Sequence, residues 1–150
     1  MAPQIVRKVV FDTNIYIRAI HRGFPGTEYI LLIDSLPFTY LSSVVSAELY
    51  AGARDSFGMN LIQSFVSRSE RVGRIVTPTH GTWSEAGRIL AKIGKQEPGY
   101  KSKFPALFND ILIALSALQI GATVYTNNEE DFRLIRRHKR FSLETVGSRS

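Results

Sequence analysis

The chain has 150 residues, of which 44% are hydrophobic and 21% charged, and these values are typical of a soluble globular protein with a real core. It contains no cysteine, which excludes disulfides, thiolate zinc sites and cysteine nucleophiles. The net charge of +6 is compatible with nucleic-acid binding, although on charge alone a solubilising surface is the better explanation.

The N-terminal half alternates between short apolar runs and amphipathic segments. Residues 5–11 predict a buried strand that ends in the polar turn Asp12-Thr13-Asn14. Four further elements are predicted before residue 70, in the order helix, strand, helix, helix: 27–36, 38–41, a helix capped by Ser42 or Ser43 that carries Glu48, and 60–68.

The C-terminal half continues the alternation, in the order strand, helix, loop, helix, strand, helix, strand: 74–78, 79–93, 95–105, 110–120, 122–126, 129–137 and 141–146. The helix at 110–120 is apolar almost all round, which predicts deep burial. Strands that alternate with helices predict an α/β fold with a mainly parallel central sheet flanked by helices. The length predicts one domain over residues 1–150.

The chain shows no sign of a targeting or membrane segment. The first residues, MAPQIVRKVV, lack the apolar stretch of a signal peptide, and no apolar run reaches membrane-spanning length. We therefore expect a cytoplasmic protein that does not bind membranes.

Four acidic residues lie beside apolar segments, where a fold usually avoids charge: Asp12, Glu48, Asp110 and Asp131. A carboxylate in such a place is unfavourable unless it is hydrogen-bonded, paired or bound to a cation. Ligands of parallel sheets gather beyond the carboxyl ends of the strands, and Asp12 and Asp131 both follow predicted strands. Glu48 and Asp110 are expected near helix starts at the same edge. Hard oxygen ligands favour Mg²⁺ or Mn²⁺.

Each acid also has a purely structural explanation. Asp12 suits a turn, and Glu48 could be an ordinary surface acid of a helix. Asp110 near a helix start would interact favourably with the helix dipole, and Asp131 could cap or begin the helix that contains Phe132. Taken singly these explanations are reasonable, but together they do not explain why the acids recur beside the most hydrophobic segments.

The ordered blocks around these acids resemble those of a known family. Asp12-Thr13-Asn14, Ser43 to Gly52, Asn109 to Ala114 and Thr126 to Phe132 are similar to the signature blocks of PIN-domain ribonucleases. They are most similar to VapC-type toxins of toxin–antitoxin pairs, and the resemblance spans residues 5 to about 135. It implies a three-layer PIN-like domain.

The resemblance also implies roles for single residues. The matching acids of that family bind Mg²⁺ or Mn²⁺, which implies Asp12, Glu48, Asp110 and Asp131 as metal ligands and catalytic residues. Many relatives carry the fourth acid where this chain has Asn128, so Asp131, or else Glu129 or Glu130, has to take that role. Thr13, Asn14 and Asn128 are candidates for orienting waters or ligands, with turn formation as an equal alternative.

These patterns predict a Mg²⁺- or Mn²⁺-dependent endoribonuclease, the toxin of a toxin–antitoxin system. The resemblance implies an antitoxin partner and a homodimer. A catalytically silent PIN-like RNA-binding or scaffold protein is the alternative, but binding alone does not need the intact acid set. A haloacid-dehalogenase-like phosphatase is disfavoured, because it needs a second aspartate where Asn14 stands. Two basic segments are candidate RNA contacts, with solvated surface as the alternative: Tyr100, Lys101 and Lys103, and Arg133, Arg136, Arg137, Lys139, Arg140 and Arg149.

Overall fold

The computed structural model describes residues 7–147. Their helices and strands, in chain order, are β1 (Val9–Phe11), α1 (Thr13–Arg22), α2 (Thr27–Ser35), η1 (Leu36–Phe38), β2 (Leu41–Ser42), α3 (Ser43–Gly52), α4 (Ser56–Arg71), β3 (Ile75–Val76), α5 (His80–Gln96), η2 (Pro98–Lys103), α6 (Phe104–Gln119), β4 (Thr123–Thr126), α7 (Glu129–Arg136) and β5 (Ser142–Thr145). The elements η1 and η2 are 3₁₀ helices.

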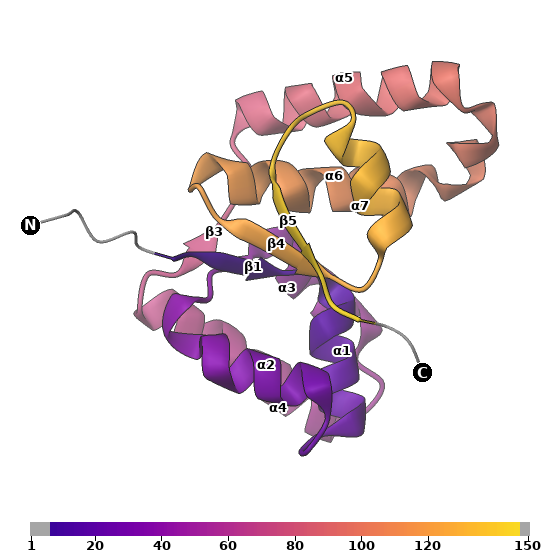
Figure 1. Cartoon of the computed structure of the whole chain (residues 1–150). Coiled ribbons are helices and arrows are strands. Elements are labelled where there is room, and N and C mark those ends of the chain that lie inside the picture. Colours follow the sequence, from indigo (N-terminus) through magenta and orange to yellow (C-terminus); the bar gives the residue numbers. More distant parts are fainter. Residues whose placement is uncertain (1–6, 148–150) are drawn as a thin grey trace, which may run out of the picture.

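All strand pairings within residues 7–147 are parallel. β4 pairs with β1 on one side and β5 on the other, and β2 pairs with β3. A parallel bridge between Val9 and Thr39 joins the two groups, so the strands follow the order β3-β2-β1-β4-β5. The predicted parallel sheet flanked by helices is confirmed. The carboxyl ends of β1 and β4 point to the same edge, where α1 and α7 begin (Figure 1).

Helices cover both sides of the strands. In Figure 1, α5, α6 and α7 lie above the sheet, and α1, α2 and α4 lie below it. α6 is the central helix of the core, because eight of its residues are buried: Leu107 and the seven consecutive residues Ile111, Leu112, Ile113, Ala114, Leu115, Ser116 and Ala117. Its burial against the sheet fixes the position of any polar residue that it carries.

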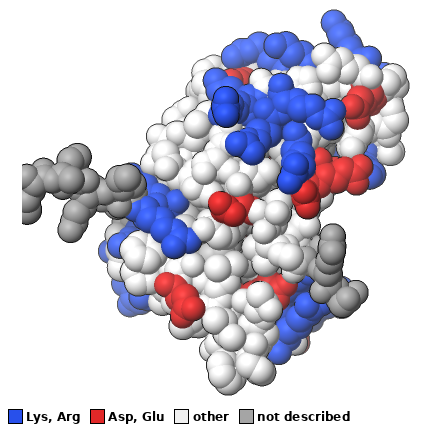
Figure 2. Space-filling view, viewed as in Figure 1, with Lys and Arg blue, Asp and Glu red and all other residues white. Residues whose placement is uncertain are grey.

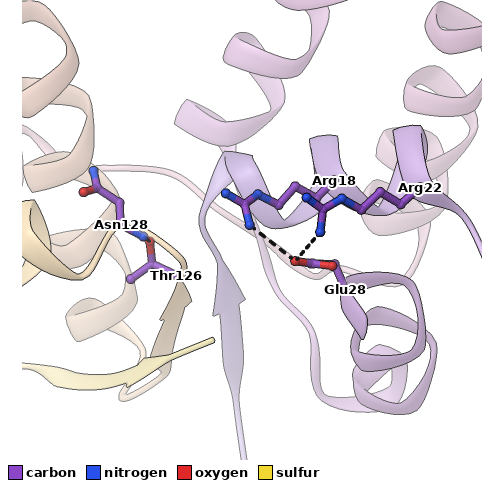
Figure 3. A network of polar contacts seen from close by, with 5 residues as sticks. All are labelled: Arg18, Arg22, Glu28, Thr126 and Asn128. Carbon is purple, nitrogen blue, oxygen red and sulfur yellow. Dashed lines mark hydrogen bonds and ion pairs between the residues drawn. The ribbon is translucent and has the colours of Figure 1, made fainter. Parts of the chain in front are cut away.

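A buried glutamate of α2 pairs with two arginines of α1. The Glu28 side chain is only 3% exposed, and its Oε1 lies 3.7 Å from Arg18 and 4.0 Å from Arg22 (Figure 3). A buried carboxylate needs such partners, and loss of the arginines would leave its charge uncompensated. The pair therefore holds α2 against the helix that begins at Asp12.

Several predicted boundaries were wrong near the site. The turn at Asp12 starts α1, which was not predicted. Residues 95–105 are not a loop, because α5 extends to Gln96, η2 follows, and α6 already starts at Phe104. Pro105 is tolerated there because it lies in the first turn of α6, where its missing N–H is not needed.

As a result, Asp110 lies in the interior of α6, and Glu48 lies in the interior of α3, so neither stands at a helix start. The helix predicted at 60–68 is the longer α4. The strand predicted at 5–11 is β1 at 9–11, and residues 5 and 6 lie outside the described part. Among residues 7–147, none of the helices combines the length and apolar character needed to cross a membrane.

Candidate functional site

Asp12 is held at the junction of β1 and α1. It is the N-cap of α1, and its Oδ1 accepts a hydrogen bond of 2.8 Å from the Thr13 backbone N–H. Its Oδ2 accepts a second bond of 2.8 Å from the Thr126 hydroxyl at the end of β4. The side chain is therefore fixed by two elements that are distant in sequence, and it is only 3% exposed. An acid at a helix N-terminus also gains from the helix dipole.

Glu48 reaches the same edge from α3. Its Oε1 accepts a bond of 2.6 Å from the Thr13 hydroxyl, which ties it to the first residue of α1. Its Oε2 accepts a bond of 3.3 Å from the Asn109 side chain on α6. The half-buried carboxylate thus lies between the residues that follow Asp12 and precede Asp110.

Asn128 connects the remaining two acids. Its Nδ2 donates to Asp131 Oδ2 at 3.0 Å and to Asp110 Oδ2 at 3.5 Å. Its backbone N–H donates to the Thr126 hydroxyl at 2.9 Å, and Figure 3 shows these two residues together at the end of β4. One hydrogen-bond chain therefore runs from Asp12 through Thr126 and Asn128 to Asp110 and Asp131.

Burial and mutual repulsion make two of these carboxylates hard to ionise. Burial raises the pKa of Asp12 to about 6, against the hydrogen bonds from Thr126 and Thr13, and the charges of Glu48 and Asp131 add to the rise. Burial raises the pKa of Asp110 to about 9, with further contributions from the charges of the other three acids. The four carboxylates therefore act as one electrostatic unit at neutral pH.

The donor chemistry of this unit fits a hard divalent cation. Among residues 7–147, none of the four acids forms an ion pair with a lysine, arginine or histidine. Hydrogen bonds alone therefore compensate the charge of the four acids, and a bound cation would compensate it better. In the same part of the chain no three acidic or histidine side chains already converge on one point.

The neighbouring acids at the start of α7 point elsewhere. Glu129 pairs with Arg133 at 2.7 Å, and Glu130 accepts a bond of 3.2 Å from the Tyr100 hydroxyl. Of the three candidates for the fourth acid, Asp131 is the one that joins the hydrogen-bond chain of Asp12.

Sequence analysis did not assign roles to Thr126 or Asn109. Thr126 is fully buried and binds both Asp12 and Asn128, and Asn109 binds Glu48. In the sequence, Asn109 directly precedes Asp110, and Thr126 opens the block that ends at Phe132. These positions were the only indication of a role for either residue. Side-chain hydrogen bonds across 114 and 61 residues of sequence could not be read from those blocks alone.

Within residues 7–147, the basic residues near the C-terminus form no ion pair with the four acids of the cluster. Figure 2 shows them over the end of α7 and the segment that follows, whereas the first turn of α7 is acidic. Three of them already have partners: Arg133 lies 2.7 Å from Glu129, Arg137 lies 3.7 Å from Glu97, and Lys139 lies 3.0 Å from Glu85. Arg149 lies outside the described residues.

Comparisons with known proteins agree on one fold. The family model of the PIN domain matches residues 9–137. No curated protein sequence matches the chain. A VapBC2 structure from Rickettsia felis, bound to a promoter DNA fragment, matches with 24% identity and a TM-score of 0.61 over 93% of this chain and 98% of that one.

Two further solved structures share the fold. DNA-bound VapBC from Salmonella typhimurium matches with 23% identity and a TM-score of 0.64 over 93% of this chain and 98% of that one. VapBC-1 from nontypeable Haemophilus influenzae matches with 20% identity and a TM-score of 0.63 over 91% and 96% of the two chains.

Proposed function

Because the chain belongs to the PIN-domain family, a family of nucleases, we propose that it is a divalent-metal-dependent endoribonuclease and the toxin of a toxin–antitoxin pair. One observation carries the proposal. Four acids from four separate segments, Asp12, Glu48, Asp110 and Asp131, share one hydrogen-bonded cluster that has no cationic side chain within residues 7–147. A protein that only binds RNA has no need for so unfavourable a cluster.

The residues divide the chemistry as follows. Mg²⁺ or Mn²⁺ at the four carboxylates would supply positive charge to the phosphoryl oxygens and a water of lowered pKa for phosphodiester hydrolysis. Thr126 and Thr13 fix the orientation of Asp12 and Glu48 through their hydroxyls. Asn128 links Asp110 to Asp131, because its side-chain amide donates to both carboxylates. Side chains locked in this way keep a reactive geometry without reorganisation.

The decisive experiment is RNA cleavage by the purified chain. We expect cleavage of single-stranded RNA with Mg²⁺ or Mn²⁺ and none with EDTA, and a DNA oligonucleotide of the same sequence tests the preference for RNA. Cleavage in EDTA would contradict the metal mechanism. Binding without cleavage under every metal condition would favour the catalytically silent alternative.

An apolar groove supports the antitoxin part of the proposal. It has a volume of about 490 Å³ and runs between α1, α2 and α4, and we call it the α2–α4 groove. Its lining residues are Tyr16, Ala19, Ile20, Gly23, Tyr29, Leu32, Ile33, Leu36, Thr39, Leu49, Phe57, Leu61, Ile62, Phe65 and Arg68. Exposed apolar surface of this kind marks an interaction site.

The lining of the groove also includes a charged side chain, that of Arg68. An apolar groove with one cation suits an amphipathic helix that carries an acid opposite Arg68. We expect an antitoxin encoded beside this chain to co-purify with it and to relieve growth arrest. Ile33→Glu should abolish both effects, whereas Lys92→Glu, which is exposed on α5, should not.

The proposal includes a homodimer. Trp83 is 48% exposed, packs against Phe108 with ring centroids 5.7 Å apart, and lies outside the α2–α4 groove. A second copy would cover this surface. Light scattering of the unmodified protein should give twice the mass of one chain, and the Trp83→Glu variant should have the mass of a single chain.

A further inference from the structure

The short helix η2 brings an aromatic residue to the edge of the acid cluster. η2 connects α5 to α6 at the right-hand end of both helices in Figure 1, close to where α7 begins. Its Tyr100 packs against the core, and its hydroxyl donates to Glu130 Oε1 at 3.2 Å. Glu130 directly precedes Asp131. Partial burial, the bond to Glu130 and the charges of Glu130 and Asp131 together raise the pKa of Tyr100, which reflects this closeness.

Two lysines of η2 remain available for an external anion. Lys101 and Lys103 are exposed, and neither has a carboxylate within 4 Å in the described residues. The Lys103 ammonium lies 5.5 Å from the centroid of the Tyr100 ring, a cation–π contact. This contact restricts the exposed side chain of Lys103 before an anion binds, so less entropy is lost on binding.

The spacing along α6 suits a nucleic-acid chain. Lys103 immediately precedes α6, and Asp110 lies within it. A rise of 1.5 Å per residue places their Cα atoms about 10 Å apart along the helix axis. An RNA strand with its scissile phosphate at the acids therefore has a neighbouring phosphate within reach of η2.

We propose that Lys101 and Lys103 form a subsite for the phosphate backbone of single-stranded RNA next to the scissile bond, and that Tyr100 is the residue that positions Lys103. The subsite rests on the proposed ribonuclease function and gives its substrate a direction, from the acids toward η2. It also explains why cations stand beside an acidic cluster without pairing with it. The competing explanation is that both lysines only keep the surface soluble.

Salt dependence of binding separates these explanations. Each phosphate contact to a single strand contributes about 0.7 to the slope of log affinity against log salt. In a full-length chain inactivated by Asp110→Asn, Lys101→Gln with Lys103→Gln should lower that slope by about 1.4 for a single-stranded RNA oligonucleotide. The matched control, Arg88→Gln with Lys92→Gln on exposed positions of α5, should leave the slope unchanged. An equal drop in both pairs, or no drop in the lysine pair, overturns the proposal.

The role of Tyr100 is tested in the active chain. Tyr100→Leu should raise KM for the oligonucleotide as much as Lys103→Gln does, with kcat unchanged, and the double variant should be no worse than either. Tyr100→Phe keeps the ring and should retain most of the affinity. Additive losses in the double variant overturn the positioning role. If the unmodified chain cuts no RNA, the proposed function fails instead, and the binding slopes still decide whether the subsite exists.

Discussion

Replacing Asp12 by asparagine should stabilise the protein when no divalent cation is bound. Its pKa in the folded protein is about 6, compared with 3.8 for an unperturbed aspartate, so ionising it at pH 8 costs about 3 kcal/mol. Asparagine removes that charge and keeps the contacts. Its oxygen can still cap α1 through the Thr13 N–H, and its amide can donate to the Thr126 hydroxyl. For a chain of this length, about 3 kcal/mol corresponds to a rise in Tm of about 6–12 °C.

The pH dependence has a defined sign. Because the folded pKa of Asp12 is raised, its protonated form contributes stability that is fully present below about pH 4. That contribution is lost as the pH rises through about 6. The advantage of Asp12→Asn over the unmodified chain should therefore be small at pH 4, grow up to about pH 6 and stay constant at pH 8.

A bound cation should remove most of the advantage of Asp12→Asn in the free energy of unfolding. Mn²⁺ at about 100 times its dissociation constant stabilises the folded state by roughly 2.7 kcal/mol. The variant has lost one ligand and should gain much less. The assay is a melting curve at pH 8 for each protein, with EDTA and with millimolar Mn²⁺.

Asp55→Asn is the matched control. Asp55 caps α4 through a bond of 2.7 Å to the Gly58 N–H, is exposed and does not belong to the acid cluster, so both of its melting curves should follow the unmodified chain. Three results would refute the reasoning: no stabilisation of the unmodified chain by Mn²⁺, an equal gain in Asp12→Asn, or no difference between the two in EDTA.

Three more predictions concern the same surfaces. Asp110→Asn should fold normally, relieve growth arrest and cut RNA at least about 100-fold more slowly. The reason is that loss of a residue that merely supports a metal ligand already lowers metal affinity or activity by about 10–100-fold. A folded variant that cuts RNA at the normal rate would refute the site. Mn²⁺ binding at pH 7 should release protons, because the pKa of Asp110 is about 9 without a cation, and the affinity for Mn²⁺ should therefore rise with pH. Calorimetry in buffers of different ionisation enthalpy measures the released protons, and a pH-independent affinity contradicts the prediction. Neutralising Arg136, Arg137 and Lys139 together should weaken RNA binding and flatten its salt dependence. Because Arg137 and Lys139 already pair with acids, most of the change should come from Arg136. An unchanged slope of log affinity against log salt would assign all three to the solvated surface.

The sequence predicted the parallel α/β arrangement and singled out the acids, because both depend on local apolar patterns. It failed at α1, since Asp-Thr-Asn is equally good as a turn and as a helix N-terminus, and only the burial of Ile15, Tyr16 and Ala19 decides between them. It failed at the start of α6, because a proline such as Pro105 is as common in a loop as in the first turn of a helix.

The cross-links of the site were beyond sequence reasoning for a different physical reason. Asp131 could be preferred to Glu129 or Glu130 only once Asn128 was placed, because all three acids share the first turn of α7. Which of them faces inward depends on the packing of α7 against α6, and no local pattern encodes that contact.

The hydrogen bond from Thr126 to Asp12 spans 114 residues of sequence. The acid cluster therefore cannot assemble when Asp12 is synthesised, because Thr126 is added to the chain much later. β1 is made first, yet its central partner β4 is among the last strands to leave the ribosome. At about 5–20 residues per second, roughly 6–23 seconds pass between the synthesis of Asp12 and that of Thr126. Throughout that interval the nascent chain carries Asp12 without the Thr126 hydroxyl that binds its Oδ2. If the chain is the ribonuclease proposed above, its acid cluster would therefore stay incomplete until translation is nearly over.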